Sequence, residues 1–206
     1  MAGLRCVTAL SASRDGGDGW FFLDASDTTT ADDDGTVLID AAGRRWKRSY
    51  DGAKMAAWFG VKSGTEVSAA IQNMLNTGNG GIDVRDGQYT STTKIVVDLY
   101  NGGASYPPPG RPSSRFDFIG SSMANTTFNT NGNDFLEATY GGTIPTQAVA
   151  VFFRYKNFSI YGPTVAAGVG LRITGAAYSQ LDSVHAVKMS TGASLTGVLT
   201  SEIRNS

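Results

Sequence analysis

The sequence predicts a mainly β protein, in which a small β-rich N-terminal module is followed by the helix-capped start of a parallel β-solenoid. Three observations predict it: a turn-rich composition, one amphipathic helix between two runs of short strands, and a 22-residue repeat near the C-terminus. Glycine accounts for 26 of the 206 residues and charged residues for only 17%, against averages of about 7% and about 25%. Such a composition suits many tight turns between short, weakly charged strands.

The N-terminal module is expected over residues 1–57. Residues 20–23 form a compact apolar run after a glycine-rich stretch, and residues 36–39 and 44–50 are separated by turn residues. We therefore predict one strand followed by a hairpin. Alternation along the second hairpin strand places three side chains on one face, namely Trp46, Arg48 and Tyr50.

Two charged groups lie in this module. Three consecutive aspartates at 32–34 are considered as a calcium loop, but adjacent positions point in different directions and the spacing of an EF-hand is missing. We interpret them as a solvated turn. The basic cluster could bind phosphate; we favour pairing with those aspartates or with a neighbouring subunit. The basic cluster consists of Arg44, Arg45, Lys47 and Arg48.

One helix is clearly predicted. Ser63 lies three residues before Glu66, which is the spacing of a capping box. Apolar residues then recur with helical periodicity, so that one face is buried. They are Val67, Ala70, Ile71, Met74 and Leu75. Thr77 and the glycines after it end the helix.

Short strands separated by polar turns follow the helix. We expect them at residues 82–84, 95–99, 116–119, 149–153 and 158–161. Residues 101–114 contain three consecutive prolines, which donate no backbone hydrogen bond, so this segment is predicted to be a projecting loop. Residues 125–133 are predicted to be an exposed polar turn region.

A repeat of 22 residues is the strongest internal signal. Residues 170–175 recur at 192–197, and residues 179–181 recur at 201–203. One coil earlier, Val149 and Val151 would match Leu171 and Ile173, and Phe158 precedes Leu181 by 23 residues. Such a period in short strands indicates a solenoid with stacked apolar residues. A leucine-rich repeat is excluded because its motif is missing.

Composition also excludes several classes of function. With one cysteine, Cys6, and one histidine, His185, the chain can form no internal disulfide and no zinc or iron–sulfur site of the Cys/His type. A net charge of −1 offers no general attraction to nucleic acid. The sequence has no apolar run of about 20 residues and no secretory signal. We expect no cofactor, no metal, no nucleic-acid partner and no membrane insertion.

A carboxylate pair is the main candidate for catalysis. In the 22-residue register, Glu202 lies beside Gln180 and near Asp182, with backbones about 8 Å apart. Inverting glycosidases hold their carboxyl groups about 6.5–9.5 Å apart. We favour a structural interpretation, since Arg204 falls beside Asp182 and would form an ion pair between coils. His185 is expected to point outward. No catalytic residue is assigned.

Exposed aromatic side chains could stack on sugar rings, but for the three tryptophans we favour packing within the N-terminal module or between subunits. The candidates are Trp20, Trp46, Trp58, Tyr100 and Tyr106.

Several of these stretches together resemble a known family. Residues 58–62, 68–72 and 82–89 resemble the opening of pectate-lyase-like right-handed β-helices, in which an Ala-Ile-Gln helix caps the first coil. Upstream, residues 16–48 contain stretches that resemble the region before the β-helix of bacteriophage tailspikes and tail fibres. The resemblance implies a tailspike head or neck adaptor over residues 1–57 and the first coils of a right-handed β-helix over 58–206.

The resemblance also implies a function. It implies a structural virion component, the N-terminal part of a tailspike or tail fibre that attaches to tail or baseplate proteins. It further implies a homotrimer that presents a region binding host-surface polysaccharide, located in the phage tail and extracellular after release. The alternatives are a polysaccharide depolymerase, either lyase or glycoside hydrolase, with its active site on the β-helix, and a non-viral β-helical adhesin.

Overall fold

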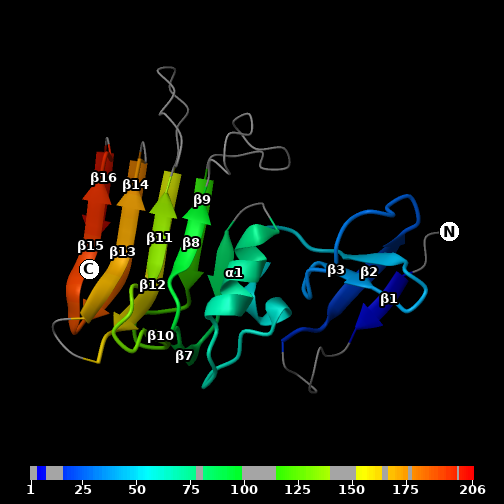
Figure 1. The fold of residues 1–206 in the computed structure, drawn as a ribbon, viewed down its shortest axis with the longest axis horizontal. Helices are drawn as coiled ribbons and strands as arrows, with labels where there is room; N and C mark the ends of the chain where they lie inside the picture. Colours follow the sequence, from blue (N-terminus) through cyan, green and yellow to red (C-terminus); the bar gives the residue numbers. More distant parts are fainter. Residues whose placement is uncertain are drawn as a thin grey trace.

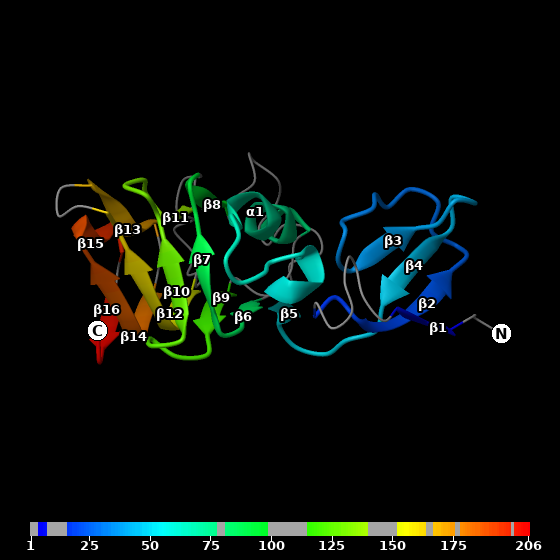
Figure 2. The same ribbon diagram turned by 90° about the horizontal axis from the view of Figure 1, so that it is seen from below.

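The computed structural model describes residues 4–7, 16–77, 81–98, 115–139, 152–163, 167–175, 178–198 and 200–206. An antiparallel sheet near the N-terminus precedes a longer stack of parallel strands (Figures 1 and 2). The predicted mainly β fold class is confirmed.

The N-terminal sheet has four strands in the order β1-β2-β4-β3. They are β1 (Leu4–Val7), β2 (Gly19–Asp24), β3 (Val37–Ile39) and β4 (Arg45–Arg48). The predicted hairpin is confirmed, because β3 and β4 pair antiparallel with Leu38 opposite Trp46. Trp46 and Arg48 are buried together, as the alternation predicts, and Phe21 of β2 joins them.

The chain then enters the solenoid. Strand β5 (Lys54–Met55) pairs in parallel with β6 (Ile82–Val84), and the single-turn helix η1 (Ala56–Phe59) follows directly. The boundary at residue 57 stays a prediction, although β5, which precedes it, already pairs with the first coil.

Helix α1 (Ser68–Asn76) covers the end of the solenoid beside β8 (Ile95–Asp98) (Figure 1). Its apolar stripe is confirmed, since Val67, Ile71 and Met74 are buried. The predicted capping box is wrong: the hydroxyl of Ser63 accepts a hydrogen bond from the backbone N–H of Gln88 instead. Before the helix, Ser63 and Gly64 form a turn whose Gly64 N–H donates to Gln88 O, and Glu66 pairs with Thr90 in a parallel bridge. The helix therefore begins only at Ser68.

The side chain of Gln72 completes the cover. Its Nε2 donates to Val96 O at 2.9 Å, and its Oε1 accepts from Val96 N at 2.8 Å. The amide of Gln72 thus imitates a neighbouring strand and satisfies backbone groups of β8 that would otherwise lie at an open edge.

Four coils follow, with strands on three faces (Figure 2). The first comprises β6, β7 (Gly87–Thr90) and β8; the second β9 (Arg115–Gly120), β10 (Thr126–Asn129) and β11 (Leu136–Thr139). In the third and fourth, β12 (Phe152–Tyr161) and β14 (Tyr178–Val187) run across two faces and are followed by β13 (Ala167–Thr174) and β15 (Met189–Thr196). Strand β16 (Thr200–Arg204) begins the next coil.

The 22-residue repeat is confirmed for the last two coils, where Leu171 pairs with Ala193 and Gln180 with Glu202. Its extension to earlier coils is wrong. Leu171 pairs with Leu136, and Phe158 pairs with Val184. The coils differ in length because the segments between strands differ, so a fixed offset holds only where those segments are equal.

The turn predicted at residues 125–133 is also wrong. It contains β10, with Thr126, Phe128 and Thr130 buried. The threonine hydroxyls donate to backbone carbonyls, Thr126 to Arg85 O at 3.2 Å and Thr130 to Tyr161 O at 3.4 Å. Hydrogen-bonded threonines therefore take inward positions that a hydropathy pattern assigns to the surface.

Four phenylalanines form the centre of the core. The rings of Phe118, Phe128, Phe135 and Phe158 are fully buried, and centroid distances among them run from 4.6 Å to 6.2 Å. The second and third coils thus share one aromatic cluster, because Phe158 of β12 packs against the three phenylalanines of the second coil. The right-handed sense of the coil stays a prediction, favoured because about 98% of parallel β crossovers are right-handed.

Some expectations lie outside the described residues: the loop at 101–114, Val149 and Val151. Across the described part of the chain, no helix is long and apolar enough to cross a membrane.

Replacing Ile71 by Asp should lower the free energy of unfolding by about 3 kcal/mol or more, because a charge enters the buried stripe of α1. Urea denaturation measures this change. Ala69→Asp, on the exposed side of the same helix, is the matched control and should change stability little. Equal stability of the two variants would show that the stripe is not buried.

Candidate functional site

The proposed carboxylate pair lies on the outward face of the sheet containing β12, β14 and β16. The predicted register is confirmed: Glu202 pairs with Gln180, and Arg204 pairs with Asp182. Both carboxylates therefore project from adjacent strands of one face, where a ligand along the solenoid would meet them.

Their contacts differ from the expectation. The ion pair predicted between Asp182 and Arg204 is replaced by two others, because the flexible side chains of Lys156 and Arg204 reach nearer carboxylates. Lys156, on the preceding coil, places its Nζ 3.5 Å from Asp182 Oδ2. Arg204 instead pairs with Glu202, two residues away on its own strand.

Hydrogen bonds keep both groups ionised. The pKa of Asp182 is lowered, first by its hydrogen bond from Ser183 and then by Asn205 and Lys156. The pKa of Glu202 is lowered mainly by the Tyr178 hydroxyl, which donates to it at 2.8 Å. Acid-assisted glycoside cleavage needs one carboxyl that holds its proton. This pair can accept hydrogen bonds from hydroxyl groups, but neither member is arranged to donate a proton.

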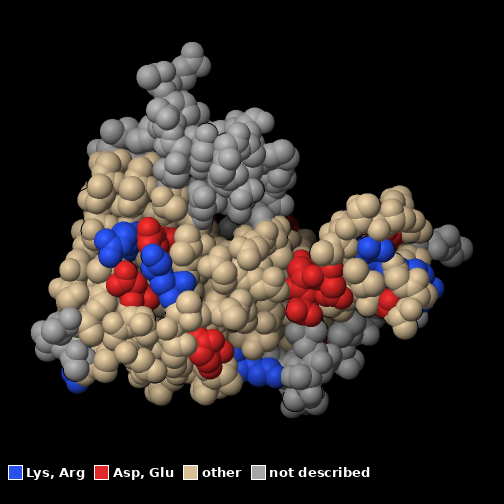
Figure 3. Space-filling model, in the orientation of Figure 1, with Lys and Arg blue, Asp and Glu red and all other residues tan. Residues whose placement is uncertain are grey.

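The other long face carries neutralised charges too. Lys94 pairs with Glu137, and Arg172 places its Nη2 3.2 Å from Asp134 Oδ2. Figure 3 shows basic and acidic atoms gathered together over the face of β8, β11 and β13. Since opposite charges alternate, this face offers no field of one sign that would attract a charged ligand.

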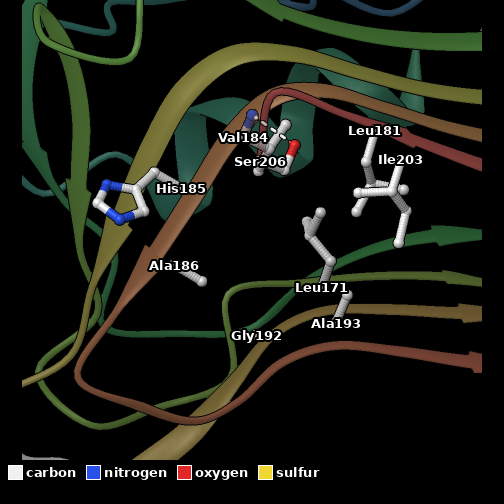
Figure 4. A pocket seen from close by; sticks show the side chains of 9 residues that line it. All are labelled: Leu171, Leu181, Val184, His185, Ala186, Gly192, Ala193, Ile203 and Ser206. Atoms are coloured by element: carbon white, nitrogen blue, oxygen red, sulfur yellow. Dashed lines mark hydrogen bonds between the residues drawn. The ribbon is translucent and has the colours of Figure 1, made fainter.

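The last coil ends in an open hollow of about 250 Å³. Its lining is largely apolar and includes Leu171, Leu181 and Ile203. His185 is exposed, as predicted. Figure 4 shows its imidazole pointing away from those three side chains, so the hollow does not gather groups for histidine-based catalysis.

The aromatic candidates separate into two groups. Trp46 and Trp58 are buried, which confirms the favoured packing role. Trp20 is 54% exposed, and Phe22, on the same face of β2, is 39% exposed. We call these two side chains the Trp20–Phe22 patch. Tyr100 and Tyr106 lie outside the described residues.

The aspartates at 32–34 bind backbone groups at the edge of the N-terminal sheet. Asp33 Oδ1 accepts from Thr36 N at 2.6 Å and Val37 N at 2.8 Å, and Asp32 Oδ2 accepts from Ile39 N at 2.7 Å. The predicted solvated turn therefore also has a structural role, because the carboxylates of Asp32 and Asp33 accept hydrogen bonds from the outer N–H groups of β3. An edge so occupied cannot accept another strand. In the described part of the chain, no group of three or more potential metal ligands is found.

The basic cluster pairs with other aspartates than those predicted. Arg44 places its Nη2 2.7 Å from Asp40 Oδ2. Lys47 Nζ lies 2.7 Å from Asp24 and 2.8 Å from Asp27. Among the described residues, no ion pair joins this cluster to residues 32–34, and the carboxylates of Asp32 and Asp33 accept backbone N–H groups instead.

Arg48 forms the joint between the two parts of the molecule. It is only 5% exposed, and its guanidinium carbon lies 4.5 Å from the ring centroids of both Phe21 and Trp58. It donates to the carbonyls of Gly17, Asp18 and Gly35 at 2.7–2.8 Å. Burial lowers the pKa of this guanidinium, but arginine remains charged in proteins.

The close packing at this joint leaves no room for a side chain at Gly19 or Gly35. A Cβ at Gly19 would lie 2.1 Å from Arg48 Nη1, and a Cβ at Gly35 would lie 2.5 Å from the Phe59 ring. A further bond joins Asn73 Nδ2 of α1 to Asp33 O at 3.0 Å. Alternation along β4 predicts that Arg48 shares a face with Trp46. It does not predict the stacking on Trp58, because no local pattern connects Arg48 with that ring.

Arg48→Met keeps the apolar stem but removes every donor to three backbone carbonyls. Because unsatisfied buried acceptors cost about 1–3 kcal/mol each, we expect the free energy of unfolding to fall by about 3 kcal/mol or more. Chemical denaturation of Arg48→Met and of Arg45→Met, a partly exposed arginine of the same strand, makes the comparison. A loss no greater than that of the control contradicts the joint.

Comparison with known proteins agrees with this architecture. Residues 4–51 match the model of the phage tail protein small four-stranded β-sheet domain, and this range includes all four strands of the observed sheet β1–β4. The fold also resembles the tailspike protein of Acinetobacter baumannii phage AM24, with a TM-score of 0.66 and 18% sequence identity. No curated protein matches the sequence.

The likeness to the tailspike covers 93% of this chain and 31% of that one, so this chain spans about a third of the tailspike's length. Together, the sheet domain and the fold support the sequence-based recognition of a bacteriophage tailspike or tail-fibre protein and of a structural tail component.

Proposed function

We propose that this chain forms the tail-proximal part of a bacteriophage tailspike or tail fibre. In this proposal, the sheet β1–β4 attaches to a tail or baseplate protein, and the solenoid carries a region that binds host-surface polysaccharide. Three copies associate as a homotrimer. The protein is part of the virion and becomes extracellular when the host lyses.

The buried Arg48 joint is the observation that carries this proposal. An attachment domain must hold the rest of a spike in a fixed direction, and this arginine connects a sheet of phage-tail type to the first turn of the solenoid through two rings and three carbonyls. A flexible linker would not need such a contact.

The Trp20–Phe22 patch supports the direction of attachment. The opposite face of the sheet is occupied by Phe21, Trp46 and Arg48, whereas the patch is an aromatic surface that is available to another protein. Aromatic side chains are enriched in protein interfaces.

Attachment is tested with virions or tail particles that lack their own spike. The double variant Trp20→Ser/Phe22→Ser should bind such particles at least about tenfold more weakly than the unchanged chain, because the main apolar contact is lost. Tyr161→Ser, an exposed aromatic of the solenoid, is the control and should bind normally. Unchanged binding of the double variant would exclude this patch as the attachment face.

The native mass should be a multiple of three copies, since an open solenoid of this size buries too little surface alone. Analytical ultracentrifugation at micromolar concentration measures it. A stable, folded species of 21.6 kDa, or one of two copies only, contradicts the homotrimer.

We also expect the 206-residue chain to cleave no polysaccharide by itself, because Asp182 and Glu202 are both held ionised and cleavage needs a proton donor. Purified chain is incubated with capsular or O-antigen polysaccharide of the host, and reducing ends and unsaturated sugars are measured. Turnover that disappears in Asp182→Asn or Glu202→Gln would establish the depolymerase instead.

A further inference from the structure

Two aromatic side chains are neighbours on the outward face of the sheet that contains β12 and β14. Phe152 and Tyr178 are in-register partners, and their ring centroids lie 5.7 Å apart with an angle of 53° between the ring planes. Phe152 is 38% exposed. Because β12 and β14 each pair with a neighbouring strand on both sides, this exposure belongs to the face of the sheet and does not depend on the end of the stack.

A row of polar side chains lies beside the two rings. Side chains alternate along a strand, so Arg154 and Gln180, which are in-register partners, project from the same face about 6.6 Å further along. Nη2 of Arg154 lies 3.1 Å from Asp117 Oδ2, but within the described ranges its buried Nε has no acceptor. Gln180 Nε2 donates to Glu202 Oε2 at 3.3 Å, which leaves the amide oxygen of Gln180 as an acceptor. A guanidinium and an amide with remaining hydrogen-bonding capacity therefore lie side by side.

A sugar ring suits this combination of surfaces. The C–H groups on one face of a hexose carry partial positive charge and stack on the negative face of an aromatic ring. A hydroxyl group can both donate and accept a hydrogen bond, so two adjacent hydroxyls can accept from the guanidinium and donate to the amide oxygen. An apolar peptide would satisfy only the rings, and a simple anion would satisfy only the arginine.

The charges of this face favour a neutral ligand. Lys156 pairs with Asp182, and Arg204 pairs with Glu202. Arg154 is already engaged by an aspartate of the preceding coil. Since opposite charges cancel in pairs, the face has no field of one sign that would attract a strongly anionic chain.

We propose that this face of β12 and β14 binds one neutral hexose unit of a host-surface polysaccharide. The sugar ring stacks on Phe152 and Tyr178. Two adjacent hydroxyls of the same sugar bind Arg154 and Gln180. This assignment rests on the proposed polysaccharide-binding role of the solenoid and names the face that performs it. The site binds without making or breaking a covalent bond, which agrees with the cleavage-free behaviour expected of this chain.

Affinity electrophoresis of the full 206-residue chain in gels containing purified capsular or O-antigen polysaccharide of the host tests the site. Phe152→Ser should raise the dissociation constant at least about tenfold, because the stacking surface is lost. Tyr161→Ser is the matched control and should bind as the unchanged chain does. Tyr161 ends the same strand and is also 38% exposed, but it pairs with β10, whereas Phe152 pairs with β9.

A second pair of variants tests the polar row. Gln180→Ala removes the amide oxygen that accepts a sugar hydroxyl and should raise the dissociation constant at least about threefold. Gln88→Ala is its control, because Gln88 is an exposed glutamine of β7 on another face of the solenoid, and binding should be unchanged. Circular dichroism confirms that each variant is folded.

The outcomes separate this site from the wider proposal. If the unchanged chain binds no host polysaccharide, the polysaccharide-binding role and this site are both overturned. If the unchanged chain binds and Phe152→Ser binds equally well, only this site is overturned. If Phe152→Ser changes the native mass in analytical ultracentrifugation, the face is an interface between copies of the chain, which also overturns the site.

Discussion

In-register stacking of inward side chains between successive coils is the constraint on which this structure depends. Parallel strands bring position to position, so each inward residue must fit the residue of the coil before and after it. Tyr89 and Phe128 are in-register partners on β7 and β10, and their rings stack with centroids 5.2 Å apart. Phe116 and Phe153 are in-register partners on β9 and β12, with ring centroids 6.3 Å apart. The outward positions then carry the charges, and alternating signs along the stack, as in Lys156 with Asp182, avoid repulsion between coils.

A stack of this kind has ends, and most of the remaining architecture deals with them. At the first coil, α1 covers the core and Gln72 occupies the edge of β8. In the N-terminal sheet, Asp32 and Asp33 occupy the edge of β3. The last coil, by contrast, has an exposed Ile203 and a free edge in the described residues.

The proposed function depends on the same stack of coils and on its junction with the N-terminal sheet. Arg48 fixes the sheet β1–β4 on the covered end of the solenoid, so a partner bound to the sheet would be held in a defined direction relative to the coils. The carboxylates Asp182 and Glu202 belong to the outward rows of the stack, and each is engaged by neighbours that lower its pKa. Their chemistry is that of structural ion pairs, which agrees with a structural tail component.

The sequence alone determined the elements whose signal is local. Periodicity located the buried stripe of α1, alternation paired Trp46 with Arg48, and the repeat aligned Gln180 with Glu202, because each depends on residues close in sequence or at a constant offset. Tertiary structure decided the rest: that β10 is a strand with buried side chains, that Arg48 stacks on Trp58, and that Asp182 pairs with Lys156. The pairing of β10 and of Asp182 depends on coils of unequal length, and Arg48 joins the N-terminal sheet to η1. In each case the partner of a side chain is set by packing in space, which no local pattern encodes.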